Sequence, residues 1–315
     1  MSLKAIRKPL YKPLEIRDRD KFLRQVRLRN RLLRCGKTVN YLLLIGVGLM
    51  FVYPFAWMAS MSLRPLSEAL SFSPNLLVKS PEWNNYVYAW QQAQISHYVR
   101  NSLLYSVLVM TAQYLAIIPA AYAFTWLEFK GKKFLWAAKF LGMMLPAEAT
   151  LIPVYYFYSK MGLVDNWFGL ILPSLFSMFG IFLFVSAFRQ IPKEVIEAAR
   201  MDRAPHRRIM LKVILPMVKP MWITHFISSL ISNWNEYFWV LMMTNSEKIR
   251  TLPVALRGLM QAEEGVPEWN VVMAGTMIQL APILIMYIFA SRKIKTAMVG
   301  TNISAKKLGG KNENT

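Results

Sequence analysis

The side chains best suited to chemistry in this sequence lie in one short segment, NWNEYFW, which runs from Asn233 to Trp239. The segment combines amides, a carboxylate and aromatic rings. Amides and carboxylates form hydrogen bonds with polar groups of a bound molecule, and aromatic faces pack against its apolar surfaces. Because residues three and four apart share one face of a helix, we expect these groups to form a common polar surface. The candidate residues are Asn233, Trp234, Asn235, Glu236 and Tyr237.

The same side chains also have ordinary structural uses. Trp and Tyr collect at the two interfaces of a bilayer, and Asn and Gln form hydrogen bonds between membrane helices. Ionisable side chains at membrane depth are costly and usually face a cavity or a partner, so Glu236 and Glu148 are candidates for a solute pathway. Solute contact and structural hydrogen bonding both stay open for this set.

Motifs for catalysis and nucleotide binding are missing from the sequence. It contains no GxxxxGK[ST] loop, no HExxH and no GxSxG. The three histidines, His97, His206 and His225, fall in separate parts of the chain and lack the spacing of metal ligands. Cys35 is the only cysteine, so no disulfide can form within the chain. We predict a non-catalytic protein with no catalytic residue and no metal site.

Long apolar runs must position these residues. Of the 315 residues, 55% are apolar, yet the formal net charge is +21, a combination that fits neither a soluble domain nor a nucleic-acid binder. Apolar runs of about 20 residues can cross a bilayer, where the backbone must be helical. We therefore predict an all-α polytopic membrane protein with six transmembrane helices, in the runs 38–62, 101–126, 134–159, 167–188, 218–243 and 271–291.

Basic residues alternate between the two sides of these runs. Residues 1–37 hold 13 Lys and Arg against three acidic residues, and 189–219 hold eight against three, whereas 244–270 hold three against four. The positive-inside rule then places both termini and the 189–219 loop in the cytoplasm. The predicted organisation is a basic cytoplasmic arm (1–37), a transmembrane domain (38–291) and a cytoplasmic tail (292–315). The arm either lies on anionic membrane lipid or only fixes the topology.

One polar segment, EAARMDRAPHRRIMLKVILP from Glu197 to Pro216, interrupts the apolar runs. Pro192 favours a helix start, so we predict a short helix over 193–201, a turn at Ala204 and Pro205, and a second helix over 206–214. The first helix should have an apolar side formed by Val195, Ile196, Ala199 and Met201. Such a cytosolic loop either docks into another protein or lies on the membrane, and the residues alone do not decide.

This segment resembles the EAA loop of ABC-importer permeases, in which Glu-Ala-Ala is followed by a glycine and later by Ile-x-Leu-Pro. The match covers Glu197, Ala198, Ala199, Leu215 and Pro216. Segments 84–106 (NNY to NSLLYS), 146–170 and 233–239 resemble carbohydrate permeases of the maltose-transporter type. One departure is Arg203, which stands where the family has its glycine. A left-handed backbone there costs a non-glycine residue on the order of 1 kcal/mol.

The resemblance implies a permease subunit in a bacterial cytoplasmic membrane that imports a sugar or oligosaccharide. It implies as partners a second homologous permease subunit, two copies of an ABC ATPase subunit and an extracytoplasmic solute-binding protein, and no nucleic acid. The chain itself would bind no cofactor, because ATP and Mg belong to the ATPase subunits. Glu197 would be a polar anchor, and the two alanines would allow close approach. The implied ATPase-coupling residues are Glu197, Ala198, Ala199, Asp202, Arg203, Ala204, Leu215 and Pro216.

Two other functions stay open. One is a stand-alone channel or secondary carrier, in which the loop is only a membrane-surface helix. The other is an ABC permease for a non-sugar solute, such as an amino acid or phosphate.

Overall fold

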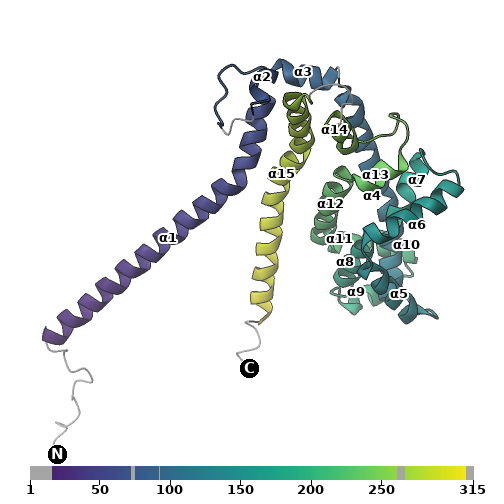
Figure 1. Cartoon of the computed structure of the whole chain (residues 1–315). Helices are drawn as coiled ribbons and strands as arrows, with labels where there is room; N and C mark the ends of the chain where they lie inside the picture. The colour runs from purple at the N-terminus through teal and green to yellow at the C-terminus, as the bar shows by residue number, and fades with distance from the viewer. Residues whose placement is uncertain (1–15, 72–74, 92, 261–266, 310–315) are drawn as a thin grey trace, which may run out of the picture. The chain divides into compact units, whose positions relative to one another are not determined.

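The computed structural model describes residues 16–71, 75–91, 93–260 and 267–309, and within these ranges every regular element is a helix (Figure 1). The prediction of an all-α fold is thereby confirmed. The elements are α1 (Ile16–Ser62), α2 (Leu66–Ala69), α3 (Asn84–Gln91), α4 (Ile95–Trp126), α5 (Lys132–Met144), α6 (Ala147–Lys160), α7 (Trp167–Ile171), η1 (Leu172–Phe176), α8 (Met178–Phe188), α9 (Lys193–Met201), α10 (His206–Arg208), η2 (Ile209–Ile214), α11 (Leu215–Met217), α12 (Lys219–Trp234), α13 (Phe238–Met243), α14 (Leu252–Met260) and α15 (Trp269–Gly309).

The chain packs as two units, Met1–Trp57 and Met58–Thr315, and the boundary falls inside α1. In the first unit, the side chains from Gly36 to Phe55 are exposed. They belong to an apolar stretch, Gly36–Ser62, that is long enough to cross a bilayer. A stretch of this kind requires lipid or a protein partner around it.

Among the residues that the structure describes, three helical stretches are long and apolar enough to cross a membrane without a break. Three further stretches qualify only as bent pairs of helices, and each pair would have to act as one span to reach six spans. The predicted third, fourth and fifth runs are therefore not single straight helices. The continuous stretches are Gly36–Ser62, Ile95–Trp126 and Trp269–Phe289; the pairs are Lys132–Met144 with Ala149–Lys160 (109°), Trp167–Phe176 with Met178–Phe188 (40°), and His206–Met217 with Lys219–Trp234 (84°).

Local sequence accounts for two of these bends. Leu145 has an extended backbone (φ −77°, ψ 128°) directly before Pro146, because a proline disfavours the helical conformation of the preceding residue. Ser177 ends η1 in an extended conformation, and its Oγ accepts a hydrogen bond from the N–H of Gly180 (3.1 Å). This N-cap starts α8 in a new direction.

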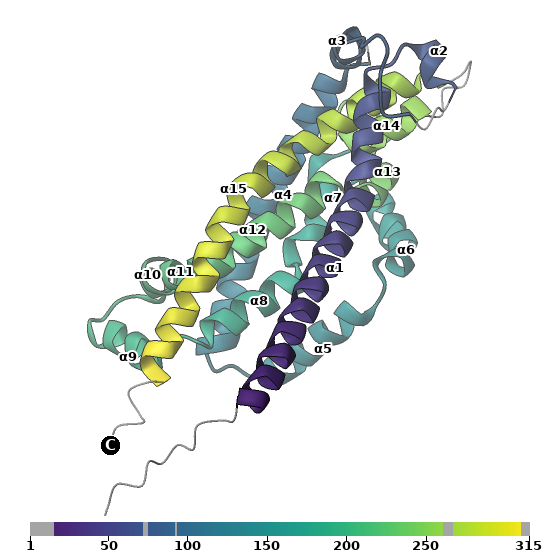
Figure 2. The same cartoon turned by 90° about the vertical axis from the view of Figure 1, so that its left-hand side faces the viewer.

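Helix α4 is the centre of the second unit. It packs against α8 and α12, while α15 packs against α3, α14 and α12 (Figure 2). Each of three buried apolar clusters includes residues of α4. The first cluster joins α4 to α8, α9 and η2, the second joins it to α3, α14 and α15, and the third joins it to α7 and α13.

The asparagines of the 84–106 segment hold loops in place. Asn101 Nδ2 donates to the carbonyls of Lys248 and Arg250, both at 2.9 Å, and so fixes the loop that leads into α14. Asn85 Nδ2 donates to the carbonyls of Ser62 (3.1 Å) and Arg64 (2.9 Å). Both asparagines are buried. These residues of the family-like segment therefore have a structural role in the helix connections.

Candidate functional site

The fifth apolar run is interrupted where the sequence predicted a polar surface. Helix α12 ends at Trp234 and α13 begins at Phe238, and the three residues between them are not helical. Glu236 Oε1 accepts a hydrogen bond from the backbone N–H of Trp239 (3.2 Å), so the carboxylate satisfies an amide at the start of α13. Non-helical backbone at membrane depth is tolerated where it is buried in protein or lines a cavity.

A pocket of about 600 Å³ opens at this break. Its volume lies in the range of sites for small molecules. Three of the predicted residues, Asn235, Glu236 and Tyr237, line it. The other lining residues come from α6, η1 and α13; they are Thr150, Leu151, Val154, Pro173, Phe238 and Trp239.

The other two predicted residues of the segment do not line this pocket. Trp234 is only 2% exposed, and its Nε1–H donates to the carbonyl of Gln279 (2.9 Å). Asn233 Nδ2 donates to Ser229 Oγ (3.1 Å). Both side chains therefore make structural hydrogen bonds: Trp234 bonds across to α15, and Asn233 bonds within α12. The backbone of Glu148 is part of α6, but its side chain lies outside the described residues.

Gln279 of α15 ties the break to a second helix, and sequence reasoning missed it. Its Nε2 donates to Asn235 Oδ1 (3.0 Å), and its carbonyl accepts from Trp234. The available signal was a polar residue inside the apolar run 271–291. Leu151, Val154 and Pro173 carried no such signal, because apolar residues in apolar runs do not reveal which of them face a pocket.

Helix α9 presents two different sides. Ile196 is buried, and Val195 and Ala199 pack against the cluster that joins α4 and α8. Ala198 is exposed, and Met201, which we expected on the apolar side, is 81% exposed. We call the outward side the α9 outer face; it consists of Glu194, Glu197, Ala198 and Met201, which are all exposed.

The turn after α9 has a left-handed backbone at Arg203, the position where the family has a glycine. Arg203 has φ +54°, in the left-handed region, which confirms that position as one that favours glycine. Its N–H donates to the carbonyl of Arg200 (2.9 Å), and the N–H of Ala204 donates to that of Ala199 (3.1 Å). These two bonds form a Schellman motif, with Asp202 as the C-cap of the helix.

The rest of the loop is fixed to the membrane helices. Tyr122 of α4 and His206 form a hydrogen bond (2.7 Å between Oη and Nδ1), and Arg200 Nη2 donates to the carbonyl of Trp126 (3.4 Å). Ile209 and Ile214 are fully buried in the π-helical segment η2. Leu215 packs against the same cluster, and Pro216, in the first turn of α11, is exposed.

Comparison with known families identifies the chain. The family model described as the binding-protein-dependent transport system inner membrane component matches residues 113–292, which include the α9 loop and the broken fifth run. The chain belongs to this family. Our prediction of an ABC-importer permease is confirmed, and the protein is a multi-pass inner-membrane component of a transport system.

Relatives of this inner-membrane component support the assignment. The probable ABC transporter permease protein YurM of Bacillus subtilis is 30% identical over 262 residues, which cover 82% of this chain and 85% of YurM. The sn-glycerol-3-phosphate transport system permease protein UgpE of Brucella abortus is 29% identical over 201 residues, covering 64% of this chain and 71% of UgpE.

A solved structure has the same fold. A chain of a bacterial ABC transporter involved in the import of the acidic polysaccharide alginate superposes with a TM-score of 0.75 at 25% identity, covering 82% of this inner-membrane component and 96% of that chain. Within the described residues, no three His, Cys, Asp or Glu side chains are grouped so that they could hold a metal ion.

Proposed function

We propose that this chain is the permease subunit of an ATP-driven importer for a sugar or oligosaccharide, and that it forms half of a pore with a second homologous permease. The support is the pocket at the break, where an amide, a carboxylate and a phenol come together. Broken helices near membrane midplanes are the usual place of substrate sites in transporters. The similarity to a polysaccharide importer favours a carbohydrate.

The α9 outer face carries the proposal of ATP coupling. It exposes an apolar Met201 and a small Ala198 beside two carboxylates, on a helix whose opposite side is packed into the protein. A rigid helix that exposes an apolar residue and a small residue is suited to a groove on a partner protein. In this proposal the partner is an ABC ATPase subunit, present in two copies, which holds ATP and Mg. Closure of the ATPase dimer would move α9 and, through Tyr122 and Arg200, helix α4.

The proposed orientation places residues 1–37, 127–133, 189–219 and 292–315 in the cytosol, because the bias of Lys and Arg favours that side. A solute-binding protein would then deliver the solute from outside the cytoplasm, as the name of the family indicates. Labelling of a single cysteine at position 206, introduced after Cys35→Ser, tests the orientation. Labelling from outside the cell would overturn it.

Reconstitution tests the function. Proteoliposomes that contain the two permeases and the ATPase, supplied with the binding protein, should accumulate sugar only with ATP. Uptake by this chain alone would instead establish a stand-alone channel or carrier.

The similarity to UgpE favours a phosphorylated polyol as a second candidate solute. Competition between labelled sugar and sn-glycerol 3-phosphate for the neighbouring binding protein separates the two. Displacement only by the phosphate ester would overturn the sugar assignment.

A further inference from the structure

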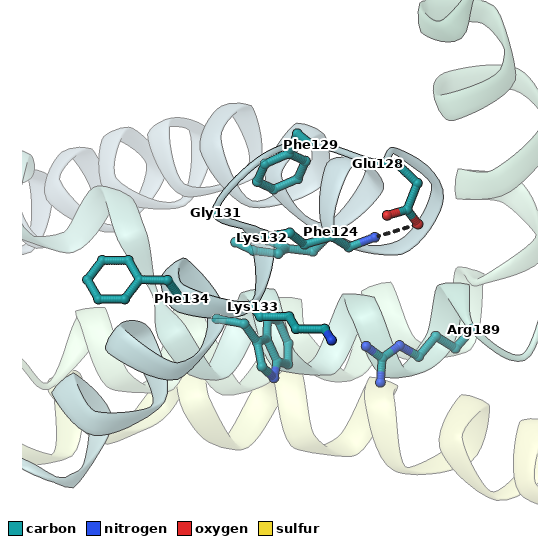
Figure 3. Close-up of a pocket in the computed structure, with 9 residues that line it drawn as sticks. Phe124, Glu128, Phe129, Gly131, Lys132, Lys133, Phe134 and Arg189 are labelled. Atoms are coloured by element: carbon teal, nitrogen blue, oxygen red, sulfur yellow. Dashed lines mark hydrogen bonds and ion pairs between the residues drawn. The ribbon is translucent and has the colours of Figure 1, made fainter.

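A second pocket, of about 680 Å³, lies between the end of α4, the turn that follows it, the start of α5 and the end of α8 (Figure 3). None of its lining residues belongs to the pocket at the break or to the α9 outer face. We call it the α4–α5 pocket. It is lined by Phe124, Glu128, Phe129, Gly131, Lys132, Lys133, Phe134, Trp136 and Arg189.

The cations of this pocket are unequally paired. Lys132 Nζ lies 3.4 Å from Glu128 Oε1 and donates to the carbonyl of Leu127 (2.8 Å). Lys133 and Arg189 point toward one another (Figure 3), and within the described part of the chain neither has a carboxylate within 4.0 Å. Two like charges that converge without a counter-charge repel each other, so the arrangement is complementary to an anion.

The arginine is also held by an aromatic ring. The guanidinium of Arg189 lies over Trp136, 5.8 Å from the ring centroid, which is within the range of a cation–π contact. The contact orients the side chain toward the pocket while its N–H groups stay available to acceptor oxygens. A planar guanidinium with free donors is well matched to a phosphate.

The opposite end of the pocket is apolar. Phe134 is 75% exposed and projects away from Lys133 and Arg189 (Figure 3). Further along α5, Leu141 is also exposed. The order of cations, then aromatic rings, then an exposed apolar helix surface is the order of a phospholipid from its headgroup to its acyl chains. Tryptophan and tyrosine are enriched at the membrane–water interface, and basic pockets on the cytoplasmic side of membrane proteins bind anionic headgroups.

We propose that the α4–α5 pocket binds the phosphate of an anionic phospholipid of the cytoplasmic leaflet, with Lys133 and Arg189 on the phosphate oxygens and Phe134 beside the acyl chains. The inference rests on the orientation given under the proposed function and goes beyond that function. Arg189 lies four residues before Lys193, where α9 begins, so a bound lipid would hold the base of the coupling loop.

The test measures lipid binding by the full-length chain in neutral detergent, using native mass spectrometry with dioctanoyl phosphatidylglycerol and dioctanoyl phosphatidylcholine. The pocket variant is Lys133→Gln with Arg189→Gln. The matched control, Lys130→Gln with Lys212→Gln, removes two exposed cations that do not line the pocket. The pocket variant should bind phosphatidylglycerol about twenty-five-fold more weakly than the wild type, from about a five-fold loss for each of its two cations, and the control should bind normally.

Three results would overturn the proposal. One is equal binding of phosphatidylglycerol by the pocket variant and its control. Another is displacement of the lipid by an equal concentration of inorganic phosphate, which would make the ligand a free anion. The third is unchanged lipid binding with loss of ATPase co-purification, which would make the pocket a protein contact. The lipid-binding measurements use neither sugar nor transport, so equal binding or displacement by phosphate leaves the proposed function untouched.

Discussion

The α9 loop and the break in the fifth run both place polar residues beside apolar helices, but their polar groups are satisfied differently. At the break, Glu236 accepts from the backbone of Trp239, and Asn235 accepts from Gln279. On the α9 outer face, the side chain of Glu197 makes no hydrogen bond or ion pair with the part of the chain that the structure describes.

This difference separates two kinds of function. The break is completed by the chain's own groups, so its pocket is already shaped, which would lower the ordering cost of binding the solute that we propose. The α9 outer face has a rigid base but an incomplete surface, and an exposed apolar residue of this kind fits an interaction surface. Changes in the two regions should therefore affect different measurements.

The largest effect is expected inside the base of α9. Ala199→Trp would force a large ring against the cluster around Phe188, because Ala199 packs inward. Overpacking of this kind typically costs about 1–3 kcal/mol, and more where the backbone cannot move. The thermal unfolding midpoint of the purified chain should fall. Glu197→Gln, on the exposed side, serves as the control and should leave the midpoint unchanged; equal midpoints for both variants would contradict the inward placement.

The next effect concerns the carboxylate at the break. Glu236→Gln keeps an oxygen that can accept from the N–H of Trp239 but removes the charge, so the fold should be retained. We expect the KM for uptake to rise about ten-fold, since hydrogen bonds to charged groups contribute about 1.5–3 kcal/mol. Asn233→Gln is the control, because it keeps an amide at a residue that does not line the pocket, and its KM should stay unchanged. Unchanged uptake kinetics of Glu236→Gln and of Asn235→Ala would remove the solute role of the segment.

A smaller effect should follow from Arg203→Gly. The left-handed backbone at this position costs arginine about 1 kcal/mol more than glycine. The variant should slow hydrogen exchange at the amide of Ala204 about five-fold, because that amide closes the Schellman motif. Lys212→Gly, outside the turn, should give no protection there. Faster exchange in Arg203→Gly would mean that the arginine side chain stabilises the turn.

The smallest effect is a pH dependence at Asp165, in the loop between α6 and α7. Hydrogen bonds from Ser246, its backbone N–H foremost, lower the pKa of Asp165 below its ordinary value of 3.8. The carboxylate therefore stabilises the folded chain fully above that value and loses this contribution as the pH falls through the lower pKa. The difference in unfolding midpoint between wild type and Asp165→Asn should be positive at about pH 6 and shrink toward about pH 3. A difference that does not change with pH would contradict this.

Sequence periodicity and composition predicted the fold class and the polar segment at Asn235–Tyr237, since apolar length and polar interruptions are local properties. They did not predict that Trp234 packs inside, because the face of a residue depends on the neighbouring helix; here Gln279 lies 45 positions away from Trp234. The left-handed backbone at Arg203 was predictable from the missing glycine. The outward direction of Met201 was not, because a short helix of mixed residues has no unambiguous apolar side.

The central claim, that the α9 outer face docks on an ATPase, is tested most directly with Ala198→Trp. The ring would lie on the exposed side, so the variant should fold with a normal unfolding midpoint. Its affinity for the ATPase, measured by co-purification of the assembled importer, should fall at least about ten-fold, and solute-stimulated ATP hydrolysis should be lost. Normal co-purification together with normal stimulated hydrolysis would contradict the account and would make α9 a membrane-surface helix.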